Sequence, residues 1–233
     1  MSGRIFKNCK EAINEIKRDI HEMGIKVHPH SMQNKIVKDD PNYETQEVQN
    51  YSFTILDTTD KNDIVGNDLD WCKAEFKERV VYCNKFTNPG KAWLLRKSTW
   101  EPFLVDGKMD YTYNARISGE DQLELVIAEL KRNPDTRQAI IQIHEPHDAL
   151  FMGGTRRIPC SLCYQLMIRN GKLDIIYMMR SSDFNSHFKN DIWLADELRR
   201  YISDATHIPV GLFMMNISSL HIYRGYNNDE KVF

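Results

Sequence analysis

The chain has 233 residues, of which 41% are hydrophobic, and its formal net charge is −2. This length suffices to bury the core of one large domain, and the near-neutral charge argues against a general nucleic-acid-binding protein, which needs a strongly basic face. There is no hydrophobic leader and no apolar run near the ~20 residues that span a membrane, so we expect a cytoplasmic protein without membrane contact.

One element is predicted within the first fifty residues. It is an amphipathic helix over 11–23, ended by Gly24, because apolar residues recur there at helical spacing. Residues 26–50 are polar and show no period, so they are interpreted as a solvated segment. We assign no role to this N-terminal part.

The remaining chain alternates predicted strands and helices. Strands are predicted over 51–56, 139–144 and 210–223, and helices over 68–76, 121–132 and 191–203. Residues 85–107 contain a Pro-Gly pair, aromatic residues and charges, which is typical of an ordered surface excursion. Long strands with interspersed helices predict a single α+β domain over 1–233, with a mixed or antiparallel sheet and flanking helices.

A β-hairpin is predicted within 157–191. The pair Asn170-Gly171 is the strongest short hairpin pattern, because both central residues of a type I′ turn need a positive φ. In a two-residue turn Arg169 faces Lys172.

The hairpin register brings a cysteine and an arginine together. Followed outward from the turn, it places Ser161 opposite Arg180 and Cys160 opposite Ser181, and a bulge would shift it by one residue. A nearby fixed cation makes a thiol a better nucleophile. Cys160 is therefore a candidate nucleophile, and the alternative is a buried, inert cysteine.

The five cysteines are odd in number and show no double pairing at metal-ligand spacing. We therefore expect reduced thiols and no metal site. A hydrolase that pairs Cys160 with His221 is a weaker hypothesis, because no oxyanion-hole motif accompanies the pair.

A set of motifs then identifies a family. They are Pro159-Cys160-x4-Gln165, Arg180-Ser181-x-Asp183, Asn190-Asp191 and His221-Ile222-Tyr223, preceded by Asp68–Trp71 and Asn133–Arg137. In order and separation these motifs together resemble the thymidylate synthase superfamily, over residues 67–223. The resemblance implies the thymidylate synthase-like fold.

The resemblance implies a chemistry for the nucleotide. Cys160 would add as thiolate to C6 of a pyrimidine nucleoside monophosphate and make C5 nucleophilic toward a one-carbon unit. Arg180 and Ser181 would hold the 5′-phosphate. Arg137 resembles the arginine that this family lends to the neighbouring subunit, which implies a homodimer, and Gln165 would support the active-site strand.

The remaining motif residues would complete the site. His221 and Tyr223 would bind the sugar 3′-hydroxyl, and Asp183 with Trp100 would face the co-substrate, 5,10-methylenetetrahydrofolate. Tyr113 matches a family tyrosine near the reacting face. Asn190 is assigned to the substrate site, and each of these residues has a structural alternative as part of a half-buried strand face or strand end.

Asp191 is the departure from the family pattern that selects the reaction. Thymidylate synthases have asparagine there, whereas an aspartate can accept from the exocyclic amine of cytosine. In this respect the chain resembles the phage-type deoxycytidylate hydroxymethylases, which add water instead of hydride to the intermediate. The alternative is that Asp191 only caps the helix it begins.

Other departures concern catalysis. Asp68 stands where the family has a glutamate that manages water and proton transfer, and it is one methylene shorter. Gln138 replaces a second arginine, and His187 replaces a glycine. The chain ends ten residues after Tyr223, so the long closing tail of thymidylate synthases is expected to be absent, which favours addition of water.

These observations predict a dCMP 5-hydroxymethylase that uses methylenetetrahydrofolate. One alternative is a thymidylate synthase or dUMP hydroxymethylase in which Asp191 is only a cap. Another is a relative that binds nucleotide without catalysis.

Overall fold

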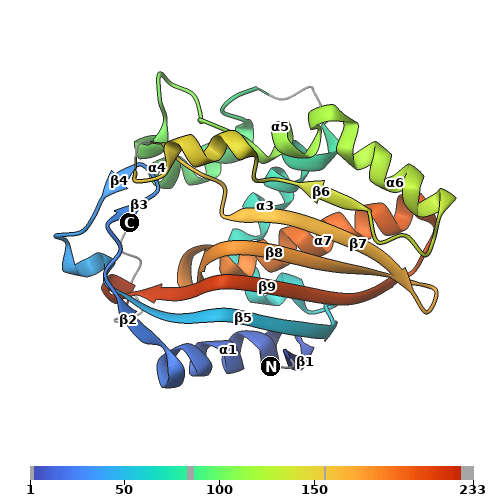
Figure 1. Ribbon diagram of the computed structural model, residues 1–233, viewed down its shortest axis with the longest axis horizontal. Helices are drawn as coiled ribbons and strands as arrows, with labels where there is room; N and C mark the ends of the chain where they lie inside the picture. Colours follow the sequence, from blue (N-terminus) through green and yellow to red (C-terminus); the bar gives the residue numbers. More distant parts are fainter. Residues whose placement is uncertain (1–2, 83–86, 155, 227–233) are drawn as a thin grey trace.

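A mixed β-sheet forms the centre of the computed structural model, which describes residues 3–82, 87–154 and 156–226 (Figure 1). Its seven described strands run in the order β1-β5-β9-β8-β7-β6, with β2 paired to β5. They are β1 (Arg4–Asn8), β2 (Ile25–Val27), β5 (Thr45–Asp57), β6 (Ile140–Gln142), β7 (Ser161–Arg169), β8 (Lys172–Asp183) and β9 (Val210–Tyr223). The pairs β1–β5 and β8–β9 are parallel and the others antiparallel, which confirms the α+β fold with a mixed sheet.

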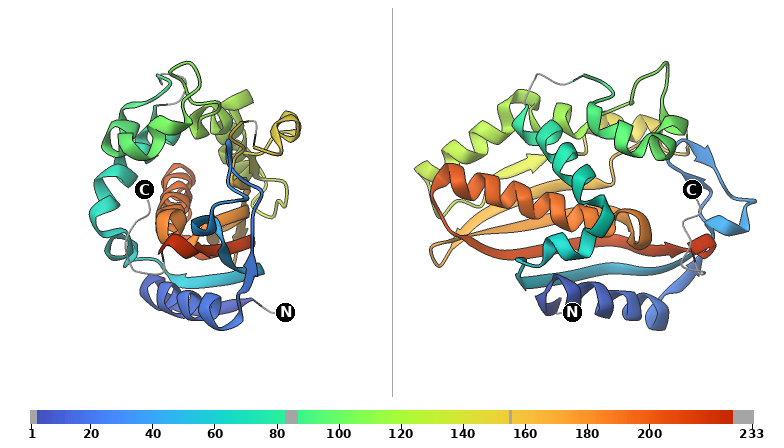
Figure 2. Two further views of the ribbon diagram at one scale, coloured as in Figure 1. Left: turned by 90° about the vertical axis from the view of Figure 1, so that its left-hand side faces the viewer. Right: turned by 180° about the vertical axis from the view of Figure 1, so that it is seen from behind.

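The helices lie mainly on one face of this sheet. They are α1 (Cys9–Met23), α2 (Lys61–Val65), α3 (Leu69–Phe76), α4 (Lys97–Trp100), α5 (Tyr113–Ile117), α6 (Gln122–Arg132) and α7 (Lys189–Thr206). Figure 2 shows α3 and α7 behind the sheet, whereas the face toward the viewer in Figure 1 carries no α-helix of the described chain. We call this second side the open face.

Local chemistry explains α1 and the central hairpin. The side chain of Asn8 accepts a hydrogen bond from the Glu11 backbone N–H and caps α1, and Gly24 follows its last residue, as predicted. Asn170 and Gly171 have φ values of 52° and 69°, as a type I′ turn requires. The predicted hairpin is therefore confirmed, with Arg169 opposite Lys172.

The predicted register fails at the far end of the hairpin. A bulge between Ser161 and Cys163 places Ser161 opposite Met179 instead of Arg180. The backbone N–H of Arg180 therefore donates to the carbonyl of Cys160 at 2.9 Å. The shift by one residue leaves the cysteine and the arginine as neighbours.

Several boundaries differ from the predictions. Strand β5 begins at Thr45, so the last part of the segment interpreted as solvated, 45–50, is sheet, because its backbone pairs with β9. Helix α7 begins at Lys189, two residues early, because it continues a helical turn over 184–188. Of the predicted surface excursion, residues 85–86 lie outside the described residues, and 91–103 form short helical turns.

The polar N-terminal segment also contains a small separate hairpin. Strands β3 (Ser31–Met32) and β4 (Lys35–Ile36) pair with each other and not with the main sheet. Gly154 lies against this hairpin with φ +88°, and a side chain there would meet Ser31 at 2.9 Å. The close packing holds the hairpin over the loop that leads into β7.

Candidate active site

A cavity of about 380 Å³ lies where β8 and β9 end and where β7 and α7 begin. Most of the predicted site residues line it, namely Trp100, Tyr113, Cys160, Arg180, Ser181, Asp183, Asn190, Asp191, His221 and Tyr223. Asp68, Arg137 and Gln165 are absent from its described lining residues. The fold thus gathers residues separated by more than a hundred positions into one enclosed space.

Three polar groups surround the sulfur of Cys160. Its Sγ lies 3.8 Å from Nη2 of Arg180, 3.6 Å from Oγ of Ser181 and 3.6 Å from Nε2 of Gln33. Each of these three groups can donate a hydrogen bond to the sulfur. Cys160 is half-buried and opens into the cavity, so a ligand can reach it. The sulfur is therefore exposed to the cavity and has polar neighbours, unlike a cysteine enclosed in the apolar core.

The guanidinium of Arg180 is held by backbone oxygens. Its Nε donates to the carbonyl of Pro159 at 2.9 Å, and Nη2 donates to the carbonyl of Ile158 at 3.0 Å. Nη1 donates to Oγ of Ser181 at 3.2 Å. Within the described parts of the chain no carboxylate forms an ion pair with Arg180, so its charge is available to an anion in the cavity.

His221 and Tyr223 form the wall contributed by β9. The two rings meet edge to face with centroids 5.0 Å apart. Burial lowers the pKa of His221, which keeps the ring neutral near pH 7. Oγ of Ser219 lies 3.2 Å from its Nδ1, so the ring is fixed and Nε2 remains for another partner.

Asp191 lies in the first turn of α7 and is not the residue that caps the helix, which is Phe188. Oγ of Ser182 donates to its Oδ2 at 3.3 Å. Burial raises the pKa of Asp191 to about 7, although the Arg79 charge and the Ser182 hydrogen bond oppose the rise. Near neutral pH the carboxyl is therefore partly protonated and can donate as well as accept a hydrogen bond.

Asp68, which the motif predicted at the reacting face, is not among the described residues that line the cavity. It forms an ion pair with Arg96 at 2.5 Å. The Asn190 amide contacts both Asp68 and Arg96 and itself lines the cavity.

Aromatic side chains form the wall opposite β9. Arg79 stacks on the ring of Tyr113, 3.8 Å from its centre, and the Tyr113 hydroxyl lies 2.9 Å from Oγ of Ser161. Trp100 stacks on His187, with centroids 5.4 Å apart and an interplanar angle of 20°. Burial lowers the pKa of His187 to about 4, so this ring is neutral. His187 thus fills space beside Trp100.

Arg137 and Gln165 are placed together but outside the cavity. Nε2 of Gln165 donates to the backbone carbonyl of Arg137 at 3.0 Å, and the Arg137 side chain is exposed. Within one subunit neither residue reaches the cavity lining. Gln165 thus ties the turn of Arg137 to strand β7.

Gln33 lines the cavity as well, although no sequence pattern indicated it. It stands in the turn between β3 and β4, with φ 55°. Its Oε1 accepts from the Ile158 backbone N–H at 3.2 Å, and its Nε2 donates to the Cys160 sulfur at 3.6 Å. These contacts span more than 120 residues, and no local pattern could have indicated them.

Among the helices of the described ranges, none combines the length and the apolar character that a membrane span requires. No group of three or more His, Cys, Asp or Glu side chains in the described ranges is arranged to hold a metal ion. The cysteines Cys9, Cys72, Cys160 and Cys163 are free, and Cys83 lies outside the described residues.

Comparison with known proteins relates the chain to curated enzymes. A thymidylate synthase of Bacillus subtilis subsp. natto is 27% identical over 136 residues, which are 54% of this chain and 48% of that protein. The deoxyuridylate hydroxymethyltransferase of Bacillus phage SP01 is 32% identical over 104 residues, which are 44% of this chain and 27% of that protein. The chain spans about half the length of the curated thymidylate synthases it matches.

Solved structures and a family model extend this likeness to most of the chain. Thermostable thymidylate synthase A of Bacillus subtilis superposes with a TM-score of 0.71 at 18% identity, covering 94% of this chain and 81% of that one. The T4 phage thymidylate synthase gives 0.70 at 20% identity, covering 95% and 79%. These structures share the fold, and the thymidylate synthase family model matches residues 37–231. The chain therefore belongs to the thymidylate synthase family.

Proposed function

We propose that this protein transfers a one-carbon unit to C5 of a pyrimidine nucleoside monophosphate, and specifically that it hydroxymethylates dCMP with 5,10-methylenetetrahydrofolate. The observation that carries the proposal is the convergence of Cys160, Arg180 and Asp191 on one cavity. Membership of the family supports the reaction class. The side chain at position 191 supports the choice of base.

Cys160 starts the chemistry. Its thiolate adds to C6 of the ring, and the electron pair moves to C5, which attacks the methylene carbon of the co-substrate. The C–N bond to the folate then breaks and the C5 proton leaves, which yields tetrahydrofolate and an exocyclic methylene. Water adds to this methylene as the thiolate is expelled, giving the 5-hydroxymethyl nucleotide without any change in the oxidation state of the folate.

The cavity supplies partners for each part of the nucleotide. Arg180 and Ser181 bind the 5′-phosphate. In the described chain no carboxylate forms an ion pair with the Arg180 guanidinium, so its charge is available to this phosphate. His221 and Tyr223, at the end of β9, bind the sugar hydroxyl, and Asn190 contacts the base beside Asp191. The sugar and the phosphate then fix the ring above the Cys160 sulfur.

Asp191 reads the base in this proposal. In its protonated form the carboxyl donates one hydrogen bond and accepts another, which matches the N3 acceptor and the N4 amine of cytosine. The Ser182 hydrogen bond to Oδ2 restrains the rotation of the carboxyl. Because its pKa is raised to about 7, the proton is available near neutral pH to stabilise charge that develops on N3.

The aromatic wall suits the co-substrate. Trp100 presents a flat surface that His187 supports from behind, and Asp183 lies at the end of β8 in the same cavity. A fused ring can stack on the indole while its N–H groups donate to the Asp183 carboxylate. Tyr113 and, through Asn190, Asp68 hold the water and protons of the reacting face.

A homodimer accounts for the open face of the sheet and for Arg137. Ile176 and Met178 lie half-buried on one side of β8, and Arg180 follows on the same side by strand alternation. A second copy on this face would cover the apolar side chains. It would also bring its exposed Arg137 toward the phosphate at Arg180.

Mixed dimers test whether Arg137 acts across the interface. Arg137→Ala and Cys160→Ala homodimers should each be nearly inactive, while a re-equilibrated equal mixture should recover about a quarter of the wild-type rate, because half the dimers carry one intact site. Steady-state assays before and after mixing measure this recovery. If Arg137 serves its own subunit, or if sedimentation shows a monomer, mixing restores nothing.

Tritium release from C5-labelled nucleotides tests the reaction itself. We expect release from dCMP that requires methylenetetrahydrofolate, slower release from dUMP, and no dihydrofolate among the products. An enzyme that acts on the uracil nucleotide is the second candidate, because a phage deoxyuridylate hydroxymethyltransferase is among the relatives. Tritium release from dUMP alone would favour this candidate. Dihydrofolate among the products would indicate a thymidylate synthase. If calorimetry shows nucleotide binding but no tritium is released, the protein is a relative that binds nucleotide without catalysis.

A further inference from the structure

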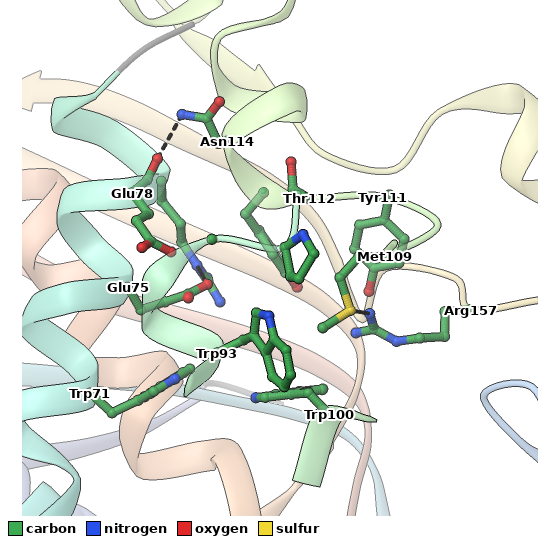
Figure 3. A pocket seen from close by; sticks show the side chains of 14 residues that line it. Trp71, Glu75, Glu78, Trp93, Trp100, Met109, Tyr111, Thr112, Asn114 and Arg157 are labelled. Carbon is green, nitrogen blue, oxygen red and sulfur yellow. Dashed lines mark hydrogen bonds and ion pairs between the residues drawn. The ribbon is translucent and has the colours of Figure 1, made fainter. Parts of the chain in front are cut away.

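Arg157 is a buried cation of the cavity that the proposed reaction does not use. Its side chain is only 8% exposed. It lines the main cavity and also an adjoining space of about 90 Å³ (Figure 3). It precedes Cys160 by three residues, so it lies near the reacting centre.

Aromatic rings surround the Arg157 guanidinium. Its central carbon lies 5.1 Å from the ring centre of Trp100, 5.0 Å from that of Tyr111 and 5.6 Å from that of Phe103. Nη1 donates to the Met109 sulfur at 3.4 Å, a weak acceptor. Nε is buried without a hydrogen-bond partner among the described residues.

Other largely buried arginines of the chain have an acidic partner. Arg116 pairs with Asp148 at 2.7 Å, and Arg79 pairs with Glu75 at 2.6 Å. Over the described ranges, no carboxylate forms an ion pair with Arg157. A buried charge without a partner is unfavourable, and the faces of the rings compensate for it only in part.

One carboxylate is close, because Oδ2 of Asp110 accepts from the backbone N–H of Arg157 at 3.1 Å, but over the described ranges it forms no ion pair with the guanidinium. The Lys35 ammonium lies 4.8 Å from the centre of the Phe103 ring and adds a second positive charge nearby. Figure 3 shows Glu75 and Glu78 on the side of the smaller cavity away from Arg157, with Trp93 between them. This part of the cavity is therefore positive, aromatic and suited to an anion.

We propose that Arg157 binds an oxyanion of the molecule that occupies this part of the cavity, as a second anion besides the phosphate at Arg180. The inference rests on the proposed function and names a further requirement of its substrates. A guanidinium binds two oxygens of one carboxylate or phosphate side by side. The source is either a carboxylate of the one-carbon donor or a further phosphate of the nucleotide.

Two matched pairs of ligands separate these sources by calorimetry. One pair is dCMP and dCDP, and the other is tetrahydrofolate and tetrahydropteroate amide, which has no carboxylate. In the pair that contains the oxyanion bound by Arg157, the wild type should bind the more anionic ligand roughly 10- to 100-fold more tightly. This is the affinity that hydrogen bonds to a charged group typically contribute. Arg157→Met should abolish this difference and leave dCMP binding unchanged, while Arg157→Lys should keep part of it.

Arg156→Met is the matched control. Arg156 is the neighbouring residue, exposed and stacked on Phe151 at 5.0 Å, so its loss changes the net charge equally without reaching the cavity. Equal affinities within both pairs on the wild type would overturn the proposal, even if Arg157→Met did not fold. Calorimetry measures binding without turnover. A failure of tritium release would therefore contradict the proposed hydroxymethylation, while the anion site at Arg157 would still be tested by the binding data.

Discussion

Replacing Cys160 by alanine is expected to lower tritium release from C5-labelled nucleotide by roughly 10⁴-fold or more, the scale of losing a covalent nucleophile. Without the sulfur, nothing adds to C6, and C5 does not become nucleophilic. Arg180 and Ser181 remain in place, because Arg180 is held chiefly by the carbonyls of Ile158 and Pro159. Nucleotide affinity should therefore stay within a few-fold of wild type, which calorimetry measures.

Cys163→Ala is the control for this substitution. Cys163 lies on the same strand, half-buried, with its thiol donating to the Met178 sulfur at 3.7 Å, and burial raises its pKa. It does not line the cavity, so its loss should leave tritium release near the wild-type rate. Substantial release by Cys160→Ala, or an equal loss in both variants, would contradict the role of Cys160 as the nucleophile.

The proximity of Cys160 and Arg180 was predictable because it depends on a local turn, although their exact pairing was not. Asn170 and Gly171 accept positive φ, and the turn sets the register of both strands. The position of the bulge between Ser161 and Cys163 was not predictable, because no residue pattern marks it. A register shift of one residue still leaves Cys160 and Arg180 on adjacent positions of neighbouring strands. The prediction that these two residues lie close together therefore did not depend on the exact register.

Other parts of the site depend on contacts that sequence patterns do not encode. Gln33 reaches Cys160 through a hairpin packed on the Gly154 loop, and nothing in residues 26–50 indicates that packing. Asp68 was predicted at the reacting face from its place in a motif. In the structure it pairs with Arg96, a residue from a different segment, and it is not among the described residues that line the cavity. Motif order therefore located the cavity, while the depth of each side chain within it required the structure.

Asp191→Asn is expected to lower the preference for dCMP over dUMP by roughly 10- to 100-fold, the value of one good two-bond base contact. An amide donates and accepts at every pH, and it accepts from N3–H of uracil while donating to O4. The carboxyl must instead carry a proton to donate. Values of kcat/KM for both nucleotides measure the preference, and an unchanged ratio would remove Asp191 from base reading.

The pH dependence of the same variant separates base reading from a structural effect. The pKa of Asp191 is raised to about 7, so its donor proton is present below pH 7 and is lost as the pH rises. The kcat/KM for dCMP should therefore fall above pH 7 in the wild type and lack this fall in Asp191→Asn. Ser182→Ala keeps the carboxyl but removes a hydrogen bond that lowers its pKa, so the fall should move to higher pH. A fall that stays in place in both variants would belong to another group.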